Sequence, residues 1–272
     1  MKKIILSLVA TLTFLDTGVV YAQDYEKGLA AYSAGDYVTT LKEWKPLAEQ
    51  GHATAQNNLG FLYYNGIGVP KNHTKAIKWY HLAAEQGLAN AQNGLGYMYA
   101  NGLGAPQDLK EAAKWYQLAA EQGHASAQNG LGSMYYKGKG APQDYTKAAE
   151  LYQLAGAQGH AMAQYSLGGL YKYGKGVPQD NTEAAKWYHL AAEQGNAAAQ
   201  YSLGGMYRDG KGVPHDIRIA HMWYNIASLS GAAGASEQVS LLEEDMTPEE
   251  WRDAVSMAAV CARSKYQNCE GF

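Results

Sequence analysis

The sequence predicts an all-α repeat protein, and three observations carry that prediction. The chain aligns with itself at a shift of 36 residues without a gap, and a fixed period between 20 and 50 residues is typical of solenoids. Apolar residues inside each unit recur at helical spacing. Glycine and tyrosine are abundant, with 31 Gly and 22 Tyr among 272 residues, and many of them stand at fixed places in the unit. We therefore expect a stack of helix pairs.

The first half of each unit is predicted to form one helix. Ala55, Leu59 and Leu62 fall at i, i+4 and i+7, which places them on one helix face. Gly66 stands just past the last periodic residue, where glycine suits a left-handed cap. Gly60 lies in the middle of the predicted helix, where glycine costs about 1 kcal/mol relative to alanine. Keeping a glycine there in every unit indicates that the partner helix approaches too closely for a side chain.

The second half of each unit is predicted to form the antiparallel partner helix. Asp108 precedes it in the second unit, and its spacing to Glu111 fits a capping box. The Trp79-Tyr80 pair and its copies fall on the packing stripe, so we expect them in the core. Equivalent cap positions hold Asp36, Asn72, Asp144, Asp180 and Asp216.

Five complete units are flanked by shorter segments. Residues 23–50 form a partial repeat, and residues 231–272 are predicted to be capping helices, because a solenoid must end in a polar face. In the latter segment, Thr247-Pro248-Glu249-Glu250 is a helix start with a capping box. The five predicted repeats are residues 51–86, 87–122, 123–158, 159–194 and 195–230.

The first residues have the layout of a secretory signal. Two lysines precede an apolar stretch over residues 4–14, and residues 20–22 end in a small-x-small pattern at Ala22. We predict a signal peptide over 1–22, cleaved after Ala22. A retained anchor is the alternative, but Asp16 interrupts the stretch. The expected location is therefore periplasmic or secreted, in a bacterium.

The two cysteines, Cys261 and Cys269, would then face an oxidising compartment, where a disulfide can persist. The loop between them is so short that a bond would constrain little unfolded-state entropy. We expect a local C-terminal disulfide, with two free thiols as the alternative.

The composition excludes several classes of protein. With 47% hydrophobic and 17% charged residues, the chain is too apolar for a disordered protein. A net charge of −3 argues against a strongly basic nucleic-acid binder. No apolar run reaches the ~20 residues that span a bilayer. We therefore expect no nucleic-acid partner and no integral membrane segment after signal cleavage.

The repeated pattern resembles the Sel1-like repeat, a relative of the tetratricopeptide repeat. It reads Ala-x-Ala-Gln-x-x-Leu-Gly-x-x-Tyr-x-x-Gly-x-Gly-x-Pro, then Ala-x-x-Trp-Tyr-x-x-Ala-Ala-x-x-Gly, and it covers residues 51–230. The resemblance implies a right-handed α/α superhelical solenoid that acts as a protein-interaction scaffold. Some secreted members carry a disulfide in each repeat. This chain has none inside its repeats, so the β-lactam-related activity claimed for that branch is not carried over.

A variable stripe on the first helices is the candidate binding surface. It lies beside the core stripe, and the tetratricopeptide relationship implies that it lines the concave face. Asn and Tyr there offer hydrogen bonds to a peptide backbone and rigid contact area; a solvated face with incidental tyrosines is the alternative. The candidate residues are Asn57, Phe61, Tyr64, Asn90, Asn93, Tyr97, Asn129, Tyr136, Lys137, Tyr165, Lys172, Tyr201 and Arg208.

A basic tendency develops toward the later units, at Lys137, Lys139, Lys172, Lys175, Arg208 and Lys211. The helix dipole stabilises cations near helix C-termini, which accounts for them without a ligand. The sharper hypothesis is a partner with an acidic group or a C-terminal carboxylate at that end.

No residue set nominates a catalytic or metal site. The chain lacks the His-Glu-x-x-His, Ser-x-x-Lys and Gly-x-Ser-x-Gly motifs. His52, His124 and His160 share one repeat position, so they should lie about 8–10 Å or more apart, too far for one metal. We expect no cofactor, no metal and no enzymatic activity.

The sequence therefore predicts an exported, non-catalytic adaptor that holds a partner protein or extended peptide in its groove. A peptidoglycan-binding protein is the second hypothesis, because tyrosines can stack on sugar rings. A hydrolase of β-lactam type is the third.

Overall fold

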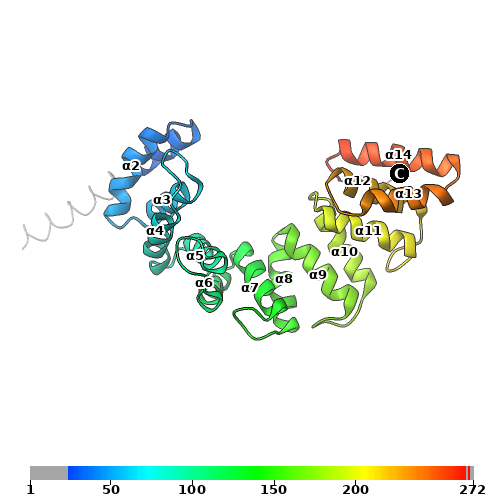
Figure 1. The fold of residues 1–272 in the computed structure, drawn as a ribbon, viewed down its shortest axis with the longest axis horizontal. Helices are drawn as coiled ribbons and strands as arrows, with labels where there is room; N and C mark the ends of the chain where they lie inside the picture. The colour runs from blue at the N-terminus through cyan, green and yellow to red at the C-terminus, as the bar shows by residue number, and fades with distance from the viewer. Residues whose placement is uncertain (1–23, 268, 270–272) are drawn as a thin grey trace, which may run out of the picture. The chain divides into compact units, whose positions relative to one another are not determined.

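The computed structural model describes residues 24–267 and 269, and it divides into two compact units, residues 24–124 and residues 125–269. The described residues are helical and contain no strand (Figure 1). The predicted signal peptide, residues 1–22, lies outside the described residues. Among the helices that the structure describes, none is long and apolar enough to cross a membrane.

The first unit contains a helical segment over residues 24–33 and then pairs of antiparallel helices, α3 with α4 and α5 with α6. The first of these pairs packs on α2 through α3, and it packs on the second pair through the contact of α4 with α5. The helix bounds are α2 Tyr37–Glu49, α3 Ala53–Asn65, α4 His73–Glu85, α5 Ala89–Asn101 and α6 Leu109–Glu121.

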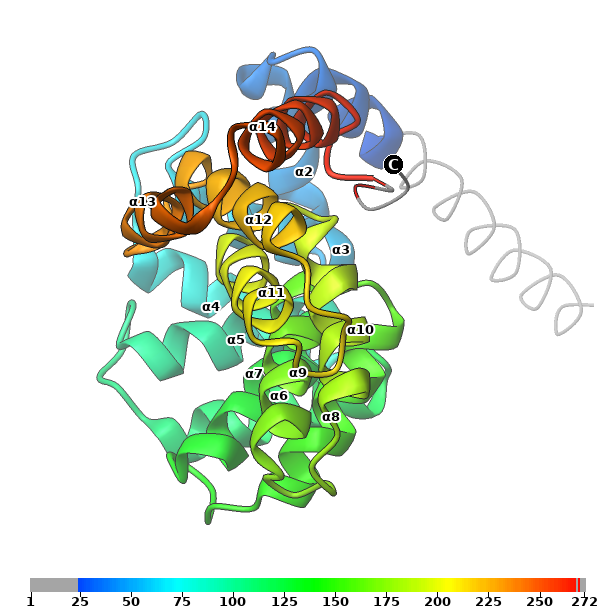
Figure 2. The same cartoon turned by 90° about the vertical axis from the view of Figure 1, so that its right-hand side faces the viewer.

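The second unit continues the same arrangement with α7 on α8, α9 on α10 and α11 on α12. It ends in α13 and α14, which both pack against α12 (Figure 2). The helix bounds are α7 Ala125–Lys137, α8 Tyr145–Ala157, α9 Ala161–Tyr173, α10 Asn181–Ala192, α11 Ala197–Asp209, α12 Ile217–Leu229, α13 Ala235–Asp245 and α14 Pro248–Arg263.

Polar caps start the second helices as the sequence predicts. Asn72 accepts a hydrogen bond from the Lys75 backbone N–H, and Asp144, Asp180 and Asp216 cap their helices in the same way. The capping box predicted at Asp108 is only half formed. Its carboxylate accepts the Glu111 N–H, but the Glu111 side chain binds Lys114 instead of reaching back.

The mid-helix glycines are packing residues. A Cβ on Gly60 would stand 2.8 Å from the ring of Tyr80 on the paired helix, closer than real Cβ atoms come. The same conflict recurs in every repeat, between Gly96 and Tyr116 and in the three copies that follow. Because the aromatic ring lies directly over the helix backbone, only glycine admits this spacing.

The constant aromatic residues are not equally buried. Tyr80 and its copies are at most 7% exposed, as predicted for the core. Trp223 is fully buried, but Trp79, Trp115 and Trp187 keep an exposed edge. The core prediction is therefore too strong for these three, because an indole in this position reaches from the core to the surface.

A ladder of glutamines links consecutive repeats. Gln164 is 3% exposed, and its amide donates to the Gly156 carbonyl at the end of the preceding helix. Its oxygen accepts a hydrogen bond from Gln194, 30 residues later, at 2.7 Å. The Gln56–Gln86, Gln92–Gln122 and Gln128–Gln158 pairs repeat this bond. The ladder stops at Gln200, whose buried oxygen has no partner among the described residues.

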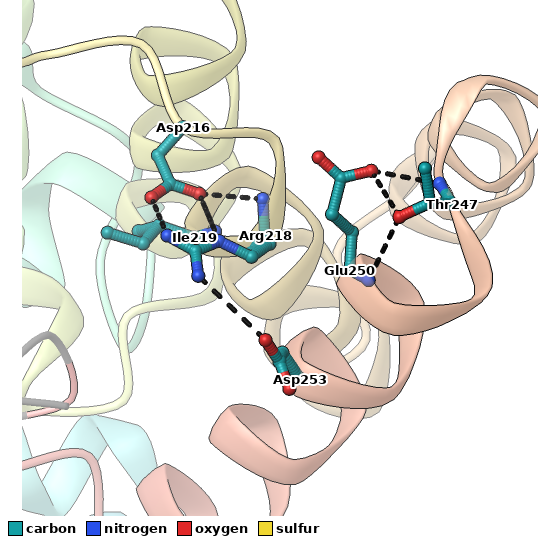
Figure 3. Close-up of polar contacts among 6 residues, drawn as sticks. All are labelled: Asp216, Arg218, Ile219, Thr247, Glu250 and Asp253. Carbon is teal, nitrogen blue, oxygen red and sulfur yellow. Dashed lines mark hydrogen bonds and ion pairs between the residues drawn. The ribbon is translucent and has the colours of Figure 1, made fainter.

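The C-terminal helices close the stack as a lid on α12. Thr247 and Glu250 form the predicted capping box at the start of α14 (Figure 3). Arg218 on α12 binds Asp216 at 2.8 Å and reaches Asp253 on α14 at 3.9 Å (Figure 3). The structure contains a disulfide between Cys261 and Cys269.

A buried histidine also ties α12 to the lid. His221 is fully buried, and its Nε2 lies 3.1 Å from Glu243 on α13. The Trp251 indole N–H of α14 donates to the same Glu243 oxygen at 2.9 Å. These contacts with His221 and Trp251 lower the pKa of the Glu243 carboxyl. One carboxylate therefore joins three helices.

Candidate functional site

The first unit contains a cavity of about 610 Å³ beside the predicted stripe. Four candidate residues line it: Asn57, Phe61, Asn90 and Asn93. Phe61 is 42% exposed, so much of its ring contacts solvent instead of packing in the core. The lining contains no Asp, Glu, Lys or Arg. Its chemistry is that of aromatic faces and neutral amides.

Part of this lining comes from residues that the sequence analysis did not single out. Tyr25 and Tyr32 stand on the helical segment 24–33, and each stacks on Trp44 with ring centroids 5.8 Å apart. A Cβ on Gly28 would clash with the Trp44 indole, just as a Cβ on Gly60 would clash with the Tyr80 ring. Gly28 lies 32 residues before Gly60 rather than 36, so alignment at the repeat period does not reveal it.

The second unit contains a cavity of about 370 Å³. Five candidate residues line it, namely Asn129, Tyr136, Lys137, Tyr165 and Lys172. The first three lie on α7 and the other two on α9. The predicted stripe is therefore brought together across neighbouring repeats, since no single helix holds all five.

Hydroxyl and apolar groups complete the second cavity, and the sequence analysis missed most of them. Ser133, Ser166 and Ser202 line it together with the 51% exposed Met162 and the 65% exposed Tyr173. Ser133 stands four residues after Asn129 on the predicted stripe, so helical spacing could have identified it. Ser166 and Ser202 directly follow Tyr165 and Tyr201 in the sequence and lie off that stripe.

Burial raises the pKa of three tyrosines that line this cavity. Burial raises the pKa of Tyr152 to about 12, although hydrogen bonds with Ser133 and Ser166 act in the opposite direction. Burial likewise raises the pKa of Tyr165 and of Tyr188. The charge in this cavity therefore comes from its lysines.

Lys137 and Lys172 are the two cationic residues of this cavity lining. Neither forms an ion pair with a described residue, and the cavity lining contains no carboxylate. Lys172 lies 5.5 Å from the ring centroid of Tyr173, and the nearby Lys175 lies 5.4 Å from that of Tyr136. Both lining lysines stand in the last turn of a helix, where the dipole favours a cation.

Four candidate residues lie outside both cavities. Tyr64 packs edge-on against Tyr97, with ring centroids 6.1 Å apart. Tyr97 is 46% exposed. Tyr201 packs against the core residue Tyr224 at 5.1 Å and is half-buried. The fourth, Arg208, is described next.

The basic tendency does not extend into the last repeat. Arg208 binds the Asp209 carboxylate at 2.8 Å, and Lys211 binds the same carboxylate at 3.2 Å. Arg208 also donates to Gln238 on α13 at 2.7 Å. Its guanidinium is therefore engaged within the protein, unlike Lys137 and Lys172.

The repeat histidines have local structural partners. His52 and His160 accept a backbone N–H through Nδ1 and so cap α3 and α9. Burial lowers the pKa of His160. His81 lies 2.8 Å from the Tyr99 hydroxyl. Within the described ranges, no group of three or more His, Cys, Asp or Glu is placed to hold a metal ion.

These features define a class of protein: an α/α repeat solenoid whose constant residues pack and cap, and whose variable residues line open cavities. The family model of the Sel1 repeat matches the chain five times, over residues 53–88, 89–124, 125–160, 161–196 and 197–231. The chain belongs to the Sel1 repeat family.

Solved structures agree with this assignment. The chain is 32% identical to a protective antigen of uropathogenic Escherichia coli strains that displays an SLR fold, with a TM-score of 0.79 over 91% of this chain. It spans only 56% of the length of that antigen. It is 34% identical to a Sel1 repeat protein of Oxalobacter formigenes, with a TM-score of 0.76 over 86% of this chain and 96% of that one.

A more distant likeness supports the fold alone. An immunity protein of Pseudomonas aeruginosa is 21% identical, with a TM-score of 0.50 over 76% of this chain and 82% of that one. No curated protein matches the chain. The predicted fold class, an α/α solenoid of Sel1-like helix pairs, is confirmed. Proteins of this family generally mediate protein–protein interactions and are typically non-catalytic scaffolds.

Proposed function

We propose that this protein is an exported, non-catalytic adaptor that holds a partner protein or extended peptide against the first helices of its repeats. One observation carries the proposal. The constant residues are engaged in packing, caps and the glutamine ladder, whereas variable stripe residues line a cavity in each unit. A surface that the scaffold itself does not need is where a ligand is expected.

The chemistry of these residues suits an extended peptide. Asparagine amides can both donate to and accept from a peptide backbone. Tyrosine and phenylalanine rings add rigid contact area at low entropic cost. Because the helix pairs fix the backbone positions of these side chains before binding, less ordering has to accompany capture.

Export to the periplasm or beyond belongs to the same proposal. It is supported by the signal-like layout of residues 1–22 and by the disulfide between Cys261 and Cys269, since disulfides persist in oxidising compartments. The similarity to a protective antigen of uropathogenic E. coli also supports it.

The proposal is tested by crosslinking in the native cell, followed by affinity capture and mass spectrometry. We expect a partner that wild type captures and that a variant with Asn57, Asn93 and Asn129 changed to Ala loses, because all three amides line the cavities. A matched control changes three exposed second-helix residues, Lys78, Lys110 and Gln153, to Ala. Capture of the same proteins by all three versions would contradict the groove.

Peptidoglycan binding is the second candidate, and the first cavity favours it. Aromatic rings beside neutral amides, in a lining without Asp, Glu, Lys or Arg, are suited to sugar rings and hydroxyls. Retention of the purified protein on purified peptidoglycan, without any partner protein, would support this function over the adaptor.

A further inference from the structure

The two lysines of the second cavity form no ion pair with a described residue, unlike three lysines elsewhere in the repeats. Lys114 and Lys186 pair with glutamates on their own helices at 2.8 and 2.9 Å, and Lys147 lies 3.9 Å from Asp144. Lys137 and Lys172 line a cavity whose lining contains no carboxylate. A concave, partly apolar site of one charge sign concentrates ions of the opposite sign.

The first unit shows that this charge is not required by the repeat. The positions equivalent to Lys137 hold Asn65 and Asn101, whose amides donate to carbonyls of their own helices at 3.0 and 2.8 Å. Those equivalent to Lys172 hold Tyr64 and Ala100. Neutral residues therefore serve the same scaffold positions, and the two lysines are particular to the second cavity.

The other lining residues of the second cavity indicate which chemical group would bind beside an anion held by the lysines. Tyr136, Tyr165 and Met162 add apolar surface to the lining, and Ser133 and Ser166 add hydroxyls. A volume of about 370 Å³ is at the lower end of the range for small-ligand sites, enough for one or two side chains. Inorganic anions alone would leave this apolar surface unused.

We propose that the cavity of the second unit binds a peptide carboxylate that stands next to an aromatic or aliphatic side chain. Lys137 and Lys172 contact the carboxylate, and the tyrosines and Met162 contact the neighbouring side chain. The carboxylate comes from an internal Asp or Glu or from a chain terminus. This inference rests on the proposed function, because it names the feature by which a partner segment is recognised.

Random heptapeptide libraries test the proposal without knowledge of the partner. One library is displayed with blocked C-termini and the other with free C-termini, and both are selected on the purified protein. We expect enrichment of an acidic group within two positions of an aromatic or aliphatic residue. The library that yields the enriched peptides distinguishes an internal carboxylate from a terminal one.

The affinities of synthesised copies of the enriched peptides for variants of the protein then locate the binding site. Lys137→Gln with Lys172→Gln should weaken binding about tenfold or more, since the substitutions remove charge-assisted hydrogen bonds to the carboxylate. The control Lys78→Gln with Lys139→Gln removes two charges outside the cavity lining and should change affinity less than about twofold. Equal thermal stability of both variants shows that folding is not the cause.

The failures of the two proposals are distinguishable. The carboxylate site is overturned if the enriched peptides lack an acidic preference. It is also overturned if they bind the Lys137→Gln, Lys172→Gln variant as tightly as the Lys78→Gln, Lys139→Gln control. If Asn57→Ala with Asn93→Ala weakens the binding of such peptides, the peptide groove stands. Libraries that yield no enriched peptide at all would overturn both.

Discussion

At the residue scale, the repeat sequence specifies which glycines pack and which are open. Gly168 and Gly169 are neighbours on α9, yet a Cβ on Gly168 would lie 2.8 Å from the Tyr188 ring, whereas the nearest atom to one on Gly169 is the Tyr188 hydroxyl at 3.7 Å. Both have the same helical backbone. The pair therefore separates helix propensity from packing.

We expect Gly168→Ala to lower the free energy of unfolding by about 1–2 kcal/mol, because overpacking costs about 1–3 kcal/mol and better helix propensity returns up to about 1. Gly169→Ala should instead raise it by about 0.5–1 kcal/mol. Urea unfolding followed by circular dichroism measures both. If the two variants shifted in the same direction, the close approach of Tyr188 would not be what excludes a side chain.

The cavity-lining residues show how far residue-level prediction reaches. Nine of the thirteen candidate residues line one of the two cavities, because a stripe read at helical spacing tracks a real surface. Sequence could not show that Asp209 neutralises Arg208, since a carboxylate next to an arginine in sequence can point elsewhere. It also could not foresee Tyr25 and Tyr32, which lie outside the repeat period.

At the element scale, the repeated sequence pattern contains the buried glutamines, but it does not show that they hydrogen-bond to one another. The constant Ala-x-Ala-Gln places a polar side chain on the core face, and a buried amide needs partners. The partner stands 30 residues later, at the end of the second helix, so a pattern within one helix cannot identify it. Repetition of both glutamines in consecutive units was the available signal.

The broken end of the ladder gives a stabilising substitution. Ser230 occupies the C-cap position of α12, where the earlier second helices of the ladder are followed by Gln86, Gln122, Gln158 and Gln194. Ser230→Gln would supply the missing donor to the buried oxygen of Gln200. We expect a gain of about 1 kcal/mol in the free energy of unfolding, the net contribution of one hydrogen bond.

The same substitution has an internal control. Gln194→Ser breaks an intact pair with Gln164 and should destabilise the protein by at least as much, because it leaves a buried acceptor unsatisfied. Thermal unfolding of the two variants measures both effects. A neutral Ser230→Gln combined with a costly Gln194→Ser would mean that the lid already compensates Gln200.

At the scale of the whole molecule, the scaffold and the ligand surface are made by different residues. Repetition predicted the fold because each unit can bury its apolar faces only against its neighbours. It could not predict the cavities, since they arise where variable side chains from adjacent repeats meet. The lid on α12 was predicted from its capping box, but its contact through His221, Glu243 and Trp251 depends on tertiary packing.

The central claim is that the first helices, not the second, face the partner. A photo-crosslinking amino acid at Phe61, Tyr97 or Tyr173 probes the first helices, and one at Leu82, Leu118 or Leu154 probes the second. The two sets are comparably exposed, at 42–65% and 43–54%. Irradiation in the native cell and mass spectrometry should give partner adducts from the first set alone. Adducts that form mainly from the three leucines would contradict the account.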